Sequence, residues 1–150
     1  MVMPHELFVY GTLLPGLCRH GAMQGAQWLG QAWVQGALFD LGDYPGLRLE
    51  GATGPVWGQL AGVDDALLQR LDAIEAYDPA HPEASEYRRE RVWAHRTQGE
   101  TRLVWTYVYA RECQHLPRIA HGDYWRYVQE TGIVPRLAPG ERMGDAGLCA

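Results

Sequence analysis

Residues 6–16 read ELFVYGTLLPG, an apolar run that ends in a turn of small residues. Phe8 and Val9 favour a β-strand, and Gly11 either takes a positive φ or lets another group approach the backbone closely. Thr12 adds a hydroxyl at the carboxyl end of the strand. We therefore expect a buried strand that leads into a ligand loop, although an ordinary strand and turn would show the same pattern.

The size of the chain, 150 residues with 47% hydrophobic and 21% charged, predicts one domain over residues 1–150. Its expected core covers about residues 6–134, and residues 135–150 form a Gly/Pro-rich tail. The net charge of −5 argues against a nucleic-acid surface, because phosphate binding needs clustered basic residues. No apolar run is long enough to span a membrane, and no signal peptide is evident.

The cysteines and histidines predict neither a disulfide framework nor a metal site. Cys18, Cys113 and Cys149 are far apart and form no C-x-x-C motif, and the six histidines are scattered. We expect reduced thiols in a cytoplasmic protein. Nucleotide-binding and hydrolase-elbow motifs are absent as well.

Short β-type segments separated by glycines follow the first loop. They are expected at residues 28–29, 31–41, 46–50 and 55–60, and a turn at residues 42–46 has Gly46 free to become left-handed. Residues 87–95 and 103–111 predict a hairpin across 97–100, and Asp123 is the expected N-cap of a last helix. Many short strands of this kind predict a small barrel or a strongly curved sheet.

The clearest helix pattern covers residues 64–77, with Asp64 or Asp65 as N-cap. Its apolar stripe also contains Glu75, whereas Asp72 is expected outside it. A carboxylate on the core side needs a partner or a proton. Glu75 is therefore either a general acid/base with a pKa raised by partial burial, or a solvent-exposed group beyond a frayed helix end, or a partner of Arg88 or Arg89.

Two further features of the sequence each have two interpretations. Tyr107 and Tyr109 fall on one face of the second hairpin strand, where they either bind a polar ligand or form an aromatic ladder that stabilises the sheet. Residues 78–86 form a polar loop with two prolines, which is either a lid or an ordinary surface loop.

Six segments together resemble the γ-glutamylcyclotransferase-like (AIG2-like) family over residues 6–128: FVYGTL at 8–13, YPG at 44–46, VWGQL at 56–60, LDAIE at 71–75, YRR at 87–89 and GDY at 122–124. The resemblance implies an α+β fold, a small mixed β-barrel with flanking helices. It implies a glutamyl-binding loop and a catalytic glutamate at Glu75, with further substrate contacts from two tyrosines. The residues implied for binding are Tyr10, Gly11, Thr12, Leu13, Tyr87 and Tyr107, with Tyr109 as an alternative to the last.

The reaction that the resemblance implies needs no cofactor or metal. The α-amine of a small γ-glutamyl substrate attacks its own γ-carbonyl, which releases an amine and leaves 5-oxoproline, while Glu75 transfers the proton. The connection from Glu75 to Tyr87 is longer than in compact members of the family, with residues 78–86 inserted, so lid shape and substrate choice stay open. The alternatives are a non-catalytic binding or regulatory module that uses the same pocket, and an amide-forming or hydrolytic relative.

Overall fold

The computed structural model describes residues 3–11, 13–14, 20–51 and 53–133. The elements follow one another as β1 (His5–Val9), η1 (His20–Met23), β2 (Gln27–Asp40), β3 (Pro45–Arg48), β4 (Gly54–Val63), α1 (Asp65–Ile74), η2 (Pro82–Ala84), β5 (Tyr87–Arg96), β6 (Thr101–Tyr109) and α2 (Tyr124–Thr131). The tail predicted for residues 135–150 lies outside the described residues.

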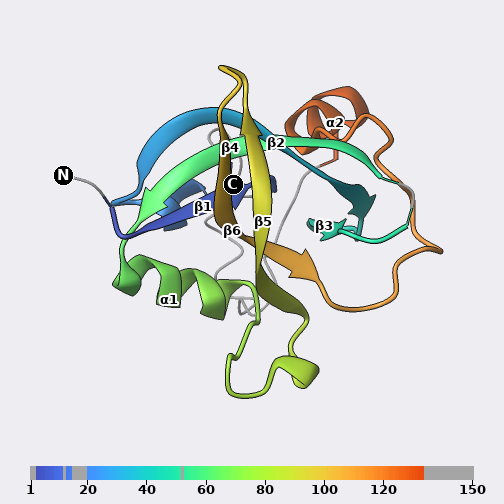
Figure 1. Ribbon diagram of the computed structural model, residues 1–150. Helices are drawn as coiled ribbons and strands as arrows, with labels where there is room; N and C mark the ends of the chain where they lie inside the picture. Colours follow the sequence, from blue (N-terminus) through green and yellow to red (C-terminus); the bar gives the residue numbers. More distant parts are fainter. Residues whose placement is uncertain (1–2, 12, 15–19, 52, 134–150) are drawn as a thin grey trace.

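Five of these strands close into a barrel in the order β2-β4-β1-β6-β5, because β5 also pairs with β2. The pair β1–β6 is parallel, the other pairs are antiparallel, and β3 extends the sheet beyond β2. The two α-helices lie on opposite sides of the barrel (Figure 1). The expected α+β class, a small mixed barrel with flanking helices, is confirmed.

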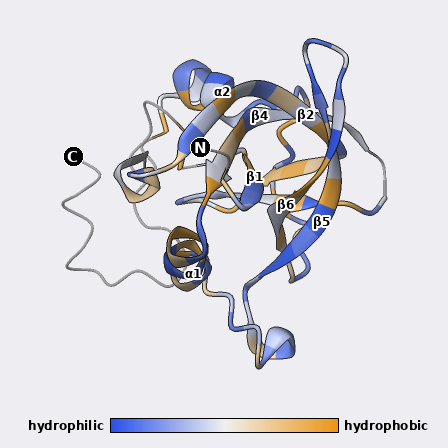
Figure 2. Cartoon of the chain, turned by 60° about the vertical axis from the view of Figure 1, so that its left-hand side comes forward, coloured by the Kyte–Doolittle hydropathy of each residue, from blue (hydrophilic) through white to orange (hydrophobic). Residues whose placement is uncertain are grey.

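Side chains alternate between two hydrophobic clusters because successive strand residues point to opposite faces. The barrel interior takes residues from all five barrel strands, including Phe8, Val34, Leu60, Ala94 and Val104. The second cluster lies on the outer face, where Leu7 and Val9 of β1 meet the leucine stripe of α1. Figure 2 shows the contrast between the hydrophilic loop that follows α1 and the hydrophobic strands at the centre of the barrel.

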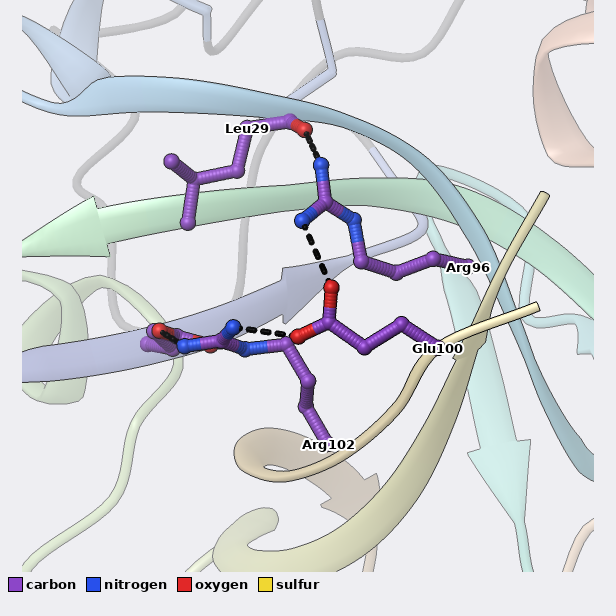
Figure 3. A network of polar contacts seen from close by, with 5 residues as sticks. Leu29, Arg96, Glu100 and Arg102 are labelled. Atoms are coloured by element: carbon purple, nitrogen blue, oxygen red, sulfur yellow. Dashed lines mark hydrogen bonds and ion pairs between the residues drawn. The ribbon is translucent and has the colours of Figure 1, made fainter. Parts of the chain in front are cut away.

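One end of the barrel is joined by a polar network (Figure 3). Arg102 of β6 binds Glu6 of β1, with its Nε 2.5 Å from Oε1, and also binds Glu100. Arg96 of β5 donates to Glu100 and to the backbone carbonyl of Leu29 in β2. The network therefore links four barrel strands, including the parallel pair β1–β6, whose register contains one residue pair.

The structure corrects two details of the predicted strands. The two strands predicted at residues 28–29 and 31–41 are the single strand β2, which ends at Asp40 and is irregular between Trp28 and Gly30. Gly46 is not left-handed: it lies in β3, and the positive φ of this turn, 108°, belongs to Gly42. A Cβ on Gly46 would lie 3.0 Å from Cβ of Tyr109, so glycine is required there by close approach.

Candidate functional site

A pocket opens where β1 ends. It is walled by the residues that follow β1, by the turn before β3 and by the carboxyl end of α1. Its lining residues are Leu7, Phe8, Val9, Tyr10, Gly11, Leu13, Tyr44, Pro45, Glu75, Tyr87 and Tyr107.

Most of the predicted site residues meet in this pocket. Tyr10, Gly11, Leu13 and Glu75 line it, together with Tyr87 and Tyr107. Thr12 lies outside the described residues. Tyr109, the alternative to Tyr107, is not among the lining residues, and its ring packs edge-on against Tyr87 at 5.3 Å.

The loop after β1 begins with a tight turn in which the Leu14 N–H donates to the Gly11 carbonyl at 3.0 Å. Gly11 does not have a positive φ. A Cβ at this position would lie 3.0 Å from Cγ of Pro45. Glycine is therefore needed here because another group approaches the backbone closely, which is one of the two predicted reasons. The missing side chain brings the loop against the turn that precedes β3.

Glu75 is held by the way in which α1 ends. The helix starts after its predicted N-cap, Asp64, and stops at Ile74, earlier than the predicted Tyr77. Ala76 has φ 53°, and the Tyr77 N–H donates to a carbonyl of the preceding turn at 2.9 Å. This left-handed C-terminal motif makes Glu75 the C-cap of the helix, and its partly buried side chain lines the pocket.

Asp72 is a correction to the predicted helix face. It was expected outside the apolar stripe, yet it is 7% exposed. It accepts the Tyr107 hydroxyl at 2.7 Å and binds the Arg89 guanidinium through Nε at 3.0 Å and a second nitrogen at 3.2 Å. Arg89, one of the two arginines considered as partners for Glu75, is thus paired with Asp72.

The tyrosine hydroxyls of the pocket wall hold the backbone together. Tyr10 donates to the Tyr107 carbonyl at 2.6 Å and accepts the Leu47 N–H at 3.2 Å, so it joins β6 to β3. Tyr87 donates to the Pro45 carbonyl at 2.5 Å. The turn that carries Tyr44 and Pro45 is fixed against the end of β1 by these bonds.

Burial keeps these phenols protonated. It raises the pKa of Tyr10 and of Tyr87 well above the usual value, and the charge of Glu75 adds to both shifts. Burial is also the largest cause that raises the pKa of Tyr107, and the hydrogen bond from Tyr107 to Asp72 is the second. The three tyrosines are therefore neutral near pH 7, so of the predicted site residues that line the pocket, Glu75 is the one able to act as a carboxylate base.

The loop at residues 78–86 is braced to the pocket. The Asp78 N–H donates to the Ser85 hydroxyl at 2.9 Å, and the Glu86 N–H donates to the Ala76 carbonyl at 3.3 Å. The Tyr44 hydroxyl of the pocket wall donates to Glu86 at 2.8 Å. The base of this loop therefore touches the pocket rim.

Sequence reasoning missed four members of the site. Tyr44 and Pro45 belonged to a recognised motif but were not predicted to line the pocket, and no local pattern places their turn beside β1. Asp72 was detectable, because it follows Leu68 by four residues and thus shares its helix face. Arg89 was considered within the YRR motif and as a possible partner of Glu75, whereas it binds Asp72 and 17% of its side chain is exposed.

Neither a metal-binding cluster nor a membrane-spanning helix occurs among the residues that the structure describes. The described part of the chain contains no group of three or more His, Cys, Asp or Glu side chains that could hold a metal ion. None of the helices in residues 3–133 that the structure describes has the length and apolar character needed to cross a membrane.

Comparisons with known proteins give the family. The profile described as "Gamma-glutamyl cyclotransferase, AIG2-like" matches residues 7–126. The chain is 35% identical over 133 residues to the γ-L-glutamyl-butirosin B γ-glutamyl cyclotransferase of Niallia circulans. The matched region covers 87% of this chain and 83% of that protein.

Solved structures share the fold at lower identity. An AIG2-like protein from Mus musculus superimposes with a TM-score of 0.64 and 23% identity over 83% of this chain and 89% of that one. YkqA from Bacillus subtilis gives a TM-score of 0.69 at 21% identity over 85% of this chain, which spans 42% of that longer protein. With its profile match and its relative at 35% identity, the chain belongs to the γ-glutamyl cyclotransferase, AIG2-like family.

Proposed function

We propose that the protein is a γ-glutamyl cyclotransferase that converts a small γ-glutamyl amine or amide to 5-oxoproline with Glu75 as general acid/base. The observation that carries this proposal is the position of Glu75: its carboxylate lines the same pocket as the Gly11 turn, in a chain of this family. The tyrosines that share the pocket are kept neutral by burial, so Glu75 is the predicted proton acceptor.

The proposed reaction is an internal acyl transfer. The α-amine nitrogen of the substrate forms a bond to its own γ-carbonyl carbon, and the bond from that carbon to the leaving nitrogen breaks. Glu75 takes a proton from the attacking amine and delivers it to the leaving nitrogen, so the carboxylate is regenerated. Backbone N–H groups of the loop after β1 stabilise the developing oxyanion, and ring closure benefits from having both reactants in one molecule.

The proposed substrate class is supported by the relative at 35% identity, whose name gives a γ-glutamyl group on butirosin B. By analogy we propose a γ-glutamyl group joined to an amine. We also propose that the protein acts in the cytoplasm as one domain, without a cofactor, metal or nucleic acid.

The test is detection of 5-oxoproline by mass spectrometry after incubation with γ-glutamyl amines, γ-glutamyl dipeptides and glutathione. We expect product from the wild type and none from Glu75→Gln, with unchanged thermal unfolding. Glu83→Gln is the matched control, because Glu83 is exposed in η2 and lies outside the pocket lining. Folded wild-type protein that yields no product from any substrate would refute the proposal.

The assay also separates the alternatives. A binding or regulatory module would be stabilised by γ-glutamyl compounds in the wild type and in Glu75→Gln without forming product. A hydrolytic relative would release glutamate in place of 5-oxoproline.

A further inference from the structure

A second hollow, here called the α2 hollow, lies on the outer wall of the barrel beside the start of α2. α2 runs next to β2 and β4 (Figure 1). The side chains that line the hollow come from β2, β4, the first turn of α2 and the loop after β1: Gln31, Trp57, Gln59, Asp123, Trp125 and Leu14.

The floor of the α2 hollow is a pair of carboxamides. Gln31 and Gln59 are direct partners in the antiparallel pair β2–β4, so their side chains share a face. Trp57 lies two residues before Gln59 and points to the same face. Neither carboxamide side chain is hydrogen-bonded to another described residue. Each therefore offers both donors and an acceptor to a ligand.

The walls of the α2 hollow suit a protonated amine. Trp57 and Trp125 present indole rings, which attract cations, and Trp125 is 48% exposed. Asp123 caps α2 by accepting the Arg126 N–H through Oδ1 at 3.1 Å. Within the described part of the chain its other oxygen accepts no hydrogen bond, and the Arg126 side chain is paired with Glu130 at 3.2 Å.

These walls are held rigidly. Gly122 has φ 72°, and a Cβ on it would lie 2.0 Å from the Pro55 carbonyl oxygen. The Trp57 N–H donates to the Gly122 carbonyl at 2.8 Å. The backbone before Asp123 is therefore locked against β4, which fixes the carboxylate beside the glutamine pair.

The α2 hollow also shares a wall with the Glu75 pocket. Val9, which lines the pocket, is the β-sheet partner of Gln59, which lines the hollow. The turn closed by the Leu14 N–H on the Gly11 carbonyl likewise contributes Gly11 to the pocket and Leu14 to the hollow. Paired strands lie about 5 Å apart, so the two sites adjoin.

We infer that the α2 hollow is the subsite for the leaving group and that it selects a leaving amine carrying a second, protonated nitrogen. This inference rests on the proposed function, because it assigns the two halves of one γ-glutamyl substrate to two adjoining sites. The glutamyl half occupies the Glu75 pocket. The cationic end of the leaving amine lies between the two indoles and against Asp123.

The test is calorimetric binding to Glu75→Gln protein, which does not consume the ligand. The probes are γ-glutamyl diaminobutane, with a cationic end, γ-glutamyl butylamine, with a neutral end, and γ-glutamyl aminobutyrate, with an anionic end. We expect the cationic probe to bind about tenfold more tightly than the neutral probe, as a cation–π contact and a carboxylate partner predict. The anionic probe is expected to bind most weakly.

Substitutions in the α2 hollow identify the source of this preference. Asp123→Asn keeps the helix cap but removes the charge, and Trp125→Ala removes one of the two indoles. Each substitution should bring the ratio of the affinities for the cationic and the neutral probe close to one. Glu90→Gln and Trp93→Ala are matched controls on exposed positions of β5, and they should leave the ratio unchanged. Equal binding of the first two probes, no binding of either, or a ratio that neither hollow substitution alters would overturn the inference. Failure of the proposed function is a separate result, namely no 5-oxoproline from the wild type.

Discussion

Replacing Asp72 by asparagine tests the polar network behind the site. The carboxylate accepts three hydrogen bonds, one from Tyr107 and two from Arg89, and 9% of its side chain is exposed. Removing one partner of a buried ion pair costs about 3–5 kcal/mol. Arg89 remains stacked on the Trp105 ring at 4.6 Å, so we expect the lower end, a loss of about 3 kcal/mol in the free energy of unfolding.

The measurement is urea and thermal unfolding of Asp72→Asn, in which a loss of about 3 kcal/mol lowers Tm by about 6–12 °C for a chain of this size. Arg89→Met and the double variant complete the cycle. Because the double variant leaves no unpaired guanidinium, its loss should be smaller than the sum of the single losses by about 2 kcal/mol. A loss below about 1 kcal/mol for Asp72→Asn, or additive effects, would show that the pair behaves like an exposed one and would refute the reasoning.

Three further predictions concern the backbone and the tyrosines. Ala76→Gly should stabilise the protein by about 0.5–1 kcal/mol in urea unfolding, because Ala76 is left-handed; a loss of stability would contradict this. Gly122→Ala should lose more than about 2 kcal/mol, because the new Cβ meets the Pro55 carbonyl; unchanged Tm would contradict it. Above pH 10 the unfolded chain loses tyrosine protons that the folded chain keeps, so the urea midpoint of unfolding should fall as the pH rises from 9 to 11. An unchanged midpoint would argue against buried phenols at Tyr10, Tyr87 and Tyr107.

Local patterns predicted the elements that depend on local physics. The hairpin of β5 and β6, the caps Asp64 and Asp123 and the inward position of Glu75 follow from periodicity and capping chemistry, and the structure agrees with them. Asp72 was predicted to lie outside the apolar stripe of Leu67, Leu68, Leu71 and Ile74. It follows Leu68 by four residues, so it shares the helix face of Leu68 and is buried with it.

The remaining parts of the site depend on long-range pairing. The turn at Tyr44 and Pro45 becomes a pocket wall because β3 folds back along β2 and Tyr87 binds the Pro45 carbonyl. The α2 hollow arises because Gly122 fits against the backbone of β4. Neither contact leaves a periodic trace in its own segment, so the sequence pattern contains no signal for either.

The last turn of α1 assigns different roles to two carboxylates that are three residues apart. Both lie near the negative end of the helix dipole, where each is unfavourable without compensation. Asp72 is compensated by Arg89 and by the Tyr107 hydroxyl, so this pairing stabilises the end of the helix. Glu75 follows three residues later and lines the pocket, where, on the proposed mechanism, its carboxylate takes the proton of the attacking amine.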